Sequence, residues 1–172
     1  WNGGLLTTAG NLLVQGTGDG RFVAYAADTG RILWALPTSV GIVAPPVTYE
    51  VDGEQYVAVM AGYGGAGPLT SGDPRTMATG RFQNDGYVLA FKLGGKAPMP
   101  KIAEKNSAIP EPPKVEATAA QLENGKYAYM RTCMVCHGAL VVSGGVVPDL
   151  RMLSAEKHSI FKEIVYDGVI HG

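Results

Sequence analysis

One short motif constrains this chain more than any other feature: Cys133-Met134-Val135-Cys136-His137. It holds both cysteines of the 172-residue chain, two residues apart, with a histidine directly after the second. Two thiols about one helical turn apart can each bond a vinyl group of the same haem, and the adjacent imidazole then lies under the iron. The motif therefore predicts a haem c bound covalently by Cys133 and Cys136, with His137 as an axial ligand of the haem iron.

Two other interpretations of the motif are weaker. A redox-active cysteine pair of the thioredoxin type would follow a strand, whereas the pattern before Cys133 is helical. A structural zinc site would need two more ligands at matching spacing, and the chain has no further cysteine. Because haem is attached to such a motif after export, we expect a protein that acts outside the cytoplasm, in the periplasm of a bacterium.

Charge and hydropathy exclude other classes. The net charge is −1 and 17% of the residues are charged, which argues against nucleic acid as a partner, since nucleic-acid binders normally carry a basic stripe. No apolar run is long enough for a transmembrane helix, and nothing in the sequence indicates peripheral association with a membrane. The chain also opens at Trp1 without a signal peptide, so we expect a piece of a longer, exported protein.

The pattern divides the chain into three parts. Residues 1–93 are rich in Gly, Thr, Val and Tyr and predict short strands, as in a sandwich, barrel or propeller. Residues 94–117 contain five prolines and no aromatic residue, and predict a stiff, extended linker. Residues 118–172 are helical in pattern. The expected strands are Leu12–Gln15, Phe22–Tyr25, Ile32–Leu36, Val47–Val51, Gln55–Met60 and Tyr87–Phe91, with a hairpin turn at Asp52-Gly53.

Two helix starts are predicted in the last part. Thr118 is an expected N-cap, and Gln121 three residues later completes a capping box. Ser154 is the second expected N-cap, before one helix that carries Ile160, Phe161, Ile164 and Val165 on one face and ends at Gly168.

This last part resembles the class I cytochrome c domain, an all-α fold. Gly125 and Tyr129 precede the motif as in that family's first helix, and Gly138 follows the histidine. Pro148-Asp149-Leu150-Arg151 matches a family segment whose proline packs on the haem edge. The resemblance leaves two roles open for Arg151, a partner of a haem propionate or a solvated surface residue.

The resemblance implies a methionine as the sixth ligand, about 40 residues after the histidine. Met152 lies too close to the motif, and Met130 and Met134 lie before or within it. We therefore expect the ligand beyond Gly172 and the domain to be truncated before it. His158 and His171 are the weaker candidates, one on an exposed helix face and the other on a loop.

The strand-rich part resembles the β-propeller of PQQ-dependent dehydrogenases. Ala27-Asp28-Thr29-Gly30-Arg31-Ile32-Leu33-Trp34 matches the tryptophan-docking motif, in which the Trp packs between neighbouring blades of an eight-bladed propeller. Further segments match the last blades in order: Trp1-Asn2-Gly3-Gly4, Thr8-Ala9-Gly10-Asn11-Leu12, Gln15-Gly16-Thr17, Pro46-Val47-Thr48-Tyr49 and Gln55-Tyr56-Val57. Gly65 and Ala66 match a loop that approaches PQQ through its backbone.

Propeller, linker and cytochrome in this order resemble a quinohaemoprotein alcohol dehydrogenase. The resemblance implies PQQ-dependent oxidation of primary alcohols to aldehydes, assisted by Ca²⁺ or a lanthanide, and electron transfer within the protein from PQQ to haem c. A blue copper protein or a cytochrome would be the external acceptor. The catalytic base and the metal ligands would lie in earlier blades, so we expect no catalytic residue in this chain and no turnover by the chain alone.

Two alternatives stay open at this point. The chain could belong to a c-type electron carrier without enzymatic activity, in which the propeller part is a docking scaffold. It could also belong to a propeller dehydrogenase of another substrate range, since the substrate pocket would lie in the earlier blades.

Overall fold

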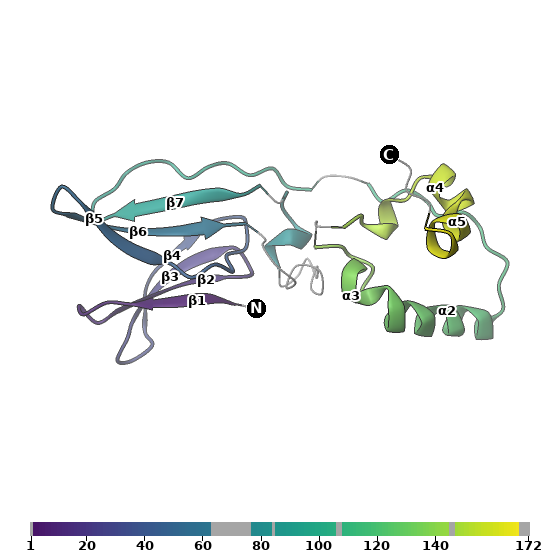
Figure 1. The fold of residues 1–172 in the computed structure, drawn as a ribbon, viewed down its shortest axis with the longest axis horizontal. Coiled ribbons are helices and arrows are strands. Elements are labelled where there is room, and N and C mark those ends of the chain that lie inside the picture. The colour runs from purple at the N-terminus through teal and green to yellow at the C-terminus, as the bar shows by residue number, and fades with distance from the viewer. Residues whose placement is uncertain (1, 63–76, 84, 106–107, 145–146, 169–172) are drawn as a thin grey trace.

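The computed structural model describes residues 2–62, 77–83, 85–105, 108–144 and 147–168. Figure 1 shows a part built of strands at one end of the molecule and a part built of helices at the other. The strands form a four-stranded antiparallel sheet, ordered β1-β2-β3-β4, and a three-stranded antiparallel sheet, ordered β5-β6-β7. Their bounds are β1 Asn2–Thr7, β2 Leu12–Thr17, β3 Arg21–Ala26, β4 Ile32–Pro37, β5 Val47–Val51, β6 Glu54–Ala61 and β7 Tyr87–Lys92.

The six predicted strands are confirmed, and β1 is a strand that we did not predict. The predicted hairpin at Asp52-Gly53 is also confirmed. Val51 pairs with Glu54, which leaves two residues for the turn, and both have positive φ, 52° and 78°. This is the backbone of the tight hairpin turn that favours Asp-Gly, because glycine accepts the left-handed conformation without strain.

The two sheets share one hydrophobic core. Phe22 of β3 is fully buried and stacks on Phe91 of β7, with ring centroids 5.1 Å apart. Trp34 of β4 meets both rings edge-on, at 6.3 Å from Phe22 and 5.9 Å from Phe91. Trp34 therefore contacts one ring in each sheet, while the residue stays 43% exposed.

The proline-rich segment expected as a linker has two different parts. Residues 94–105 run back along β7 (Figure 1), and Met99 and Ile102 pack against the core of the sheets. The Gln83 N–H donates to the Ala103 carbonyl at 2.9 Å, and the Lys105 N–H donates to the Arg81 carbonyl at 2.8 Å. Residues 108–116 are exposed throughout. Only the second part of the segment has the features of an extended linker.

The helical part begins with the predicted capping box. The Gln121 N–H donates to Thr118 Oγ1 at 3.3 Å, and the Thr118 N–H donates to Gln121 Oε1 at 2.8 Å. These bonds satisfy donors that the first helical turn leaves free. The helices are α2 Ala119–Thr132, α3 Met134–His137, α4 Ala155–Ser159 and α5 Phe161–Tyr166, with single 3-10 turns η1 Ala78–Gly80 and η2 Leu150–Met152.

The prediction of one helix after Ser154 is wrong. Ser154 is an N-cap, and its hydroxyl accepts from the Lys157 N–H at 3.2 Å, but the helix breaks at Ile160. There the backbone leaves the helical region, with φ −102° and ψ 12°. The Ser159 hydroxyl donates to the Glu156 carbonyl at 2.6 Å, a local bond of the kind that competes with the helical ladder. α4 and α5 are the two pieces.

Candidate functional site

The two thiols of the motif lie one helical turn apart. Cys133 ends α2, where its N–H donates to the Tyr129 carbonyl at 2.9 Å, and it also begins α3. Its carbonyl accepts from the N–H of Cys136 at 3.2 Å and from the N–H of His137 at 2.9 Å. Both cysteines are free thiols, Cys136 exposed and Cys133 half-buried. The turn thus presents two unpaired thiols at the spacing that two vinyl groups of one haem require.

The imidazole of His137 is held by a backbone carbonyl. Its Nδ1 lies 2.9 Å from the carbonyl oxygen of Pro148, eleven residues further along the chain. Because a carbonyl oxygen only accepts, Nδ1 is the donor in this bond, and in the neutral imidazole Nε2 then carries the lone pair. This second hydrogen bond is the usual way in which a protein fixes the tautomer and the ring orientation of a metal-ligating histidine.

A tyrosine on α2 braces the turn that follows His137. Tyr129 donates its hydroxyl to the Gly138 carbonyl at 2.6 Å, and Gly138 is buried. Burial raises the pKa of Tyr129, so the hydroxyl stays protonated and remains a donor at neutral pH. Gly138 has φ 84°, and a Cβ atom there would lie 2.2 Å from the Val142 carbonyl oxygen. Only glycine fits this tight exit from the motif.

Arg151 is paired with an acidic neighbour. It forms a forked pair with Asp149, with Nε at 3.0 Å from Oδ1 and Nη2 at 2.7 Å from Oδ2. Asp149 also caps η2, where its Oδ1 accepts from the Arg151 N–H at 3.0 Å. Burial raises the pKa of Asp149, but the hydrogen bonds and the charge of Arg151 outweigh burial, and the pKa lies below its ordinary value. Asp149 is therefore an ionised, well-held carboxylate directly after Pro148.

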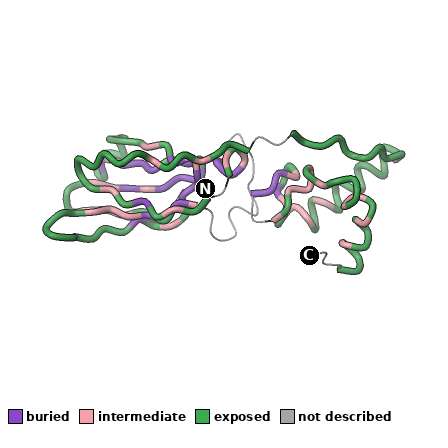
Figure 2. The backbone as a smooth tube through the Cα atoms, turned by 90° about the horizontal axis from the view of Figure 1, so that it is seen from above, coloured by how far each residue is buried: buried purple, intermediate pink, exposed green. Residues whose placement is uncertain are grey.

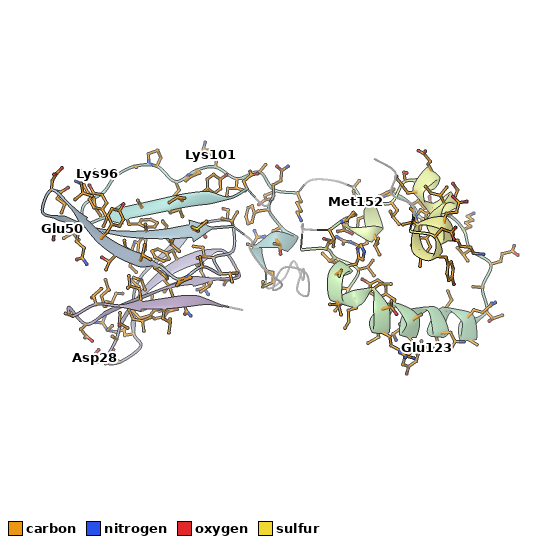
Figure 3. The ribbon with its side chains drawn as sticks, in the orientation of Figure 1. Asp28, Glu50, Lys96, Lys101, Glu123 and Met152 are labelled. Atoms are coloured by element: carbon orange, nitrogen blue, oxygen red, sulfur yellow. The ribbon has the colours of Figure 1, made fainter. Side chains whose placement is uncertain are left out.

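Only some of the candidates for the sixth haem ligand lie among the residues that the structure describes. Met152 ends η2 at the side of the helical part that faces α3 (Figure 3), and His158 is half-buried on α4, not on an exposed face as predicted. His171 and the predicted PQQ-binding residues Gly65 and Ala66 lie outside the described residues. Among the residues that the structure describes, no three or more His, Cys, Asp or Glu side chains gather as they would to hold a metal ion.

The residues present fit a covalently bound haem. The site offers two unpaired thiols, an imidazole with a free Nε2, and a turn braced by Tyr129 and by the Pro148 carbonyl. The sequence analysis named Tyr129 and Pro148, but it did not predict either hydrogen bond. Both bonds end on a backbone carbonyl, that of Gly138 for the Tyr129 hydroxyl and that of Pro148 for His137, and a backbone carbonyl leaves no pattern in the sequence.

Comparison with known proteins covers nearly the whole chain. Residues 1–57 match the family model described as "Glucose/ethanol/alcohol dehydrogenase, beta-propeller domain". The "Quinohemoprotein alcohol dehydrogenase ADH-IIG" of Pseudomonas putida is 48% identical over 168 residues, which are 98% of this chain and 23% of that protein. The solved structure of ADHIIG from Pseudomonas putida HK5 matches 97% of this chain, and 24% of its own, with a TM-score of 0.77 and 46% identity. The chain is homologous to the quinohemoprotein alcohol dehydrogenases.

A second relative gives the same result. The "Quinohemoprotein alcohol dehydrogenase" of Comamonas testosteroni is 43% identical over 170 residues, which are 98% of this chain and 23% of that protein. Its crystal structure matches all of this chain and 26% of its own, with a TM-score of 0.71 and 36% identity. The chain thus spans about a quarter of the length of the relatives it matches. The predicted resemblance is confirmed, and the structural matches include the helices as well as the sheets.

Proposed function

We propose that this chain is part of an enzyme that oxidises primary alcohols to aldehydes and passes the electrons through a haem c to an external acceptor. The observation that carries the proposal is the geometry of the haem motif, in which Pro148 holds Nδ1 of His137 and leaves Nε2 free beside two unpaired thiols. The homologous quinohemoproteins support the reaction class. Oxidation of the alcohol releases two electrons and two protons.

The roles of the residues follow from their positions. The sulfur atoms of Cys133 and Cys136 would form the thioether bonds, and Nε2 of His137 would bind the iron. Tyr129 and the Pro148 carbonyl would keep the turn and the imidazole in place while the charge of the iron changes. When bound, PQQ would supply the two-electron oxidation and haem the one-electron storage.

The remaining assignments belong to the same proposal. Residues 1–93 would be the last blades of an eight-bladed propeller, residues 94–117 the connection, and residues 118–172 a class I cytochrome c domain whose methionine ligand lies beyond Gly172. Gly65 and Ala66 would approach PQQ through their backbone. Ca²⁺ or a lanthanide would be bound by residues of earlier blades, together with the catalytic base.

The proposal also includes a cellular location for the protein. Since haem is attached to such motifs after export, the enzyme would work in the bacterial periplasm, and a blue copper protein or a cytochrome would take its electrons. No helix in the described ranges combines the length and the apolar character that crossing a bilayer requires.

The proposal is tested on the complete, exported protein loaded with PQQ. Addition of a primary alcohol is expected to produce the visible absorption bands of a reduced c-type haem. A C133A/C136A variant serves as the control, because it lacks both thioether bonds and is expected to lose covalently bound haem on a denaturing gel stained for haem.

A further inference from the structure

A serine hydroxyl bonds to the residue just before the one that holds His137. The Ser143 hydroxyl donates to the Val147 carbonyl at 2.5 Å, and Val147 directly precedes Pro148. The Pro148 carbonyl in turn accepts from Nδ1 of His137 at 2.9 Å. Two consecutive carbonyl groups are thus held by hydrogen bonds, one from the serine hydroxyl and the next from the imidazole.

Ser143 lies in a buried stretch of the helical part. It is 1% exposed and its neighbours Val142 and Gly144 are also buried, whereas α2, α3, α4 and α5 bury no residue. Figure 2 shows buried backbone in the helical part at this stretch. Because little water reaches Ser143, water competes weakly for its hydrogen bond to Val147, and the hydroxyl keeps one position.

The backbone before Ser143 is tied to the turn that follows the haem motif. A Cβ atom on Gly138 would lie 2.2 Å from the Val142 carbonyl oxygen, so these two segments are in close contact. The Val141 N–H donates to the Gly138 carbonyl at 3.1 Å, and the Tyr129 hydroxyl donates to the same oxygen at 2.6 Å. Ser143 therefore extends from a backbone position that α2 and the haem motif fix.

Few torsions separate the carbonyl that Ser143 holds from the carbonyl that holds His137. The Val147–Pro148 peptide is planar, so the Val147 carbonyl and the nitrogen and Cα of Pro148 turn together. The proline ring fixes φ of Pro148 at about −65°. Only ψ of Pro148 then remains free between the two carbonyl groups, and Asp149 begins η2 directly after it as the N-cap.

We propose that Ser143 is a positioning residue for the haem ligand His137. Its hydroxyl holds the Val147–Pro148 peptide, and this peptide sets the direction of the carbonyl that accepts from Nδ1. The inference rests on the proposed function, because it takes Nε2 of His137 as a ligand of the haem iron. A well-placed acceptor at Nδ1 makes the imidazole a stronger electron donor, which stabilises ferric over ferrous iron.

The experiment compares S143V with S143T in the complete, haem-loaded protein. Valine and threonine have nearly the same shape, so the cost of the added bulk is common to both variants, and only threonine keeps a hydroxyl. Titration with redox mediators, without alcohol, measures the reduction potential of the haem. In S143V the equilibrium is expected to shift toward ferrous haem by about two- to tenfold, the effect of weakening one hydrogen bond. S143T is expected to keep the native potential.

Two further variants separate the hydroxyl from packing and from general stability. S143A removes the hydroxyl without adding bulk to the buried position, and its potential is expected to shift in the same direction as that of S143V. Ser159 provides the matched control, since its hydroxyl also donates to a backbone carbonyl, that of Glu156 at 2.6 Å, but in α4. S159A is expected to keep the native potential.

The electron paramagnetic resonance spectrum of the oxidised haem gives a second readout, because its g values depend on the orientation and donor strength of the axial imidazole. These values are expected to change in S143V and S143A and to remain native in S143T and S159A. Native potentials and g values in S143V and S143A would overturn the positioning role, as would equal shifts in S143V and S143T. If alcohol leaves native haem oxidised, the proposed electron transfer fails, whereas the mediator titration still decides the role of Ser143.

Discussion

At the scale of single residues, the hydroxyl of Tyr129 stabilises the turn that follows the haem motif. The Tyr129 hydroxyl on α2 donates to the carbonyl of the buried Gly138 at 2.6 Å. Replacing Tyr129 by Phe removes this donor but leaves the Gly138 carbonyl the Val141 N–H at 3.1 Å, so the expected cost is that of one hydrogen bond, about 1 kcal/mol. We expect Y129F to lower the free energy of unfolding by that amount, measured by guanidinium denaturation of the haem-loaded protein.

The control for this prediction lies two residues earlier. Tyr127 is 61% exposed, so Y127F is expected to change stability by less than about 0.5 kcal/mol. Equal stabilities of Y129F and Y127F would show that the hydroxyl of Tyr129 does not hold the turn.

A second residue-scale prediction concerns acid stability. The pKa of Asp149 is lowered by Arg151, so its ionised form stabilises the fold. This contribution is fully present above the ordinary aspartate pKa, about 3.9, and is lost as the pH falls through the lower pKa of the folded state. D149N keeps an oxygen that can cap η2 but lacks the charge, and it is expected to be less stable than the native protein above about pH 5.

Denaturation curves over a range of pH test this expectation. The stability difference between the native protein and D149N is expected to be constant near neutral pH and to shrink below about pH 3.9. A difference that grows as the pH falls would contradict the assignment of Asp149 as a stabilising carboxylate.

At the scale of elements, α2 depends on its first turn, because it buries no residue of its own. The capping box of Thr118 and Gln121 is therefore a larger share of its stability than in a packed helix. T118A is expected to destabilise the helical part by about 1 kcal/mol, measured by denaturant unfolding monitored by circular dichroism. T118S retains the hydroxyl and is expected to match the native protein, and a loss of stability in T118S equal to that in T118A would exclude the cap as the cause.

The secondary-structure elements that the sequence predicted are those with a local pattern. Alternation, turn residues and capping residues are local, and they predicted the strands from β2 to β7, the Asp52-Gly53 turn and both N-caps. The break at Ile160 was missed because a serine hydroxyl bonding back to Glu156 has no distinctive sequence pattern. The docking of residues 94–105 was missed for a related reason: two apolar residues, Met99 and Ile102, in a proline-rich run are too few to form an apolar period.

The candidate site also has residues that the sequence predicts and hydrogen bonds that it does not predict. The spacing alone predicts Cys133, Cys136 and His137 as the residues that bind haem, and this assignment stays a prediction. The hydrogen bonds that orient them come from Pro148 and Tyr129 across a folded turn, and their geometry depends on tertiary structure.

At the scale of the whole molecule, a part built of two sheets adjoins a part built of helices, with Trp34 in contact with rings of both sheets and the exposed stretch 108–116 leading to α2 (Figure 1). Under the proposed function, the sheet part would belong to the domain that oxidises the substrate, and the helical part would store the electrons. We propose that electrons from an alcohol reach a haem bound by Cys133 and Cys136.

The most direct test is a difference spectrum of the complete, PQQ-loaded protein in the oxidised state, recorded before and after a primary alcohol is added. Reduced c-type haem bands are expected after the alcohol is added. The same bands are expected to be missing when PQQ is omitted and in the C133A/C136A variant. Haem that is reduced by dithionite but unchanged by alcohol in the PQQ-loaded protein would contradict the proposal.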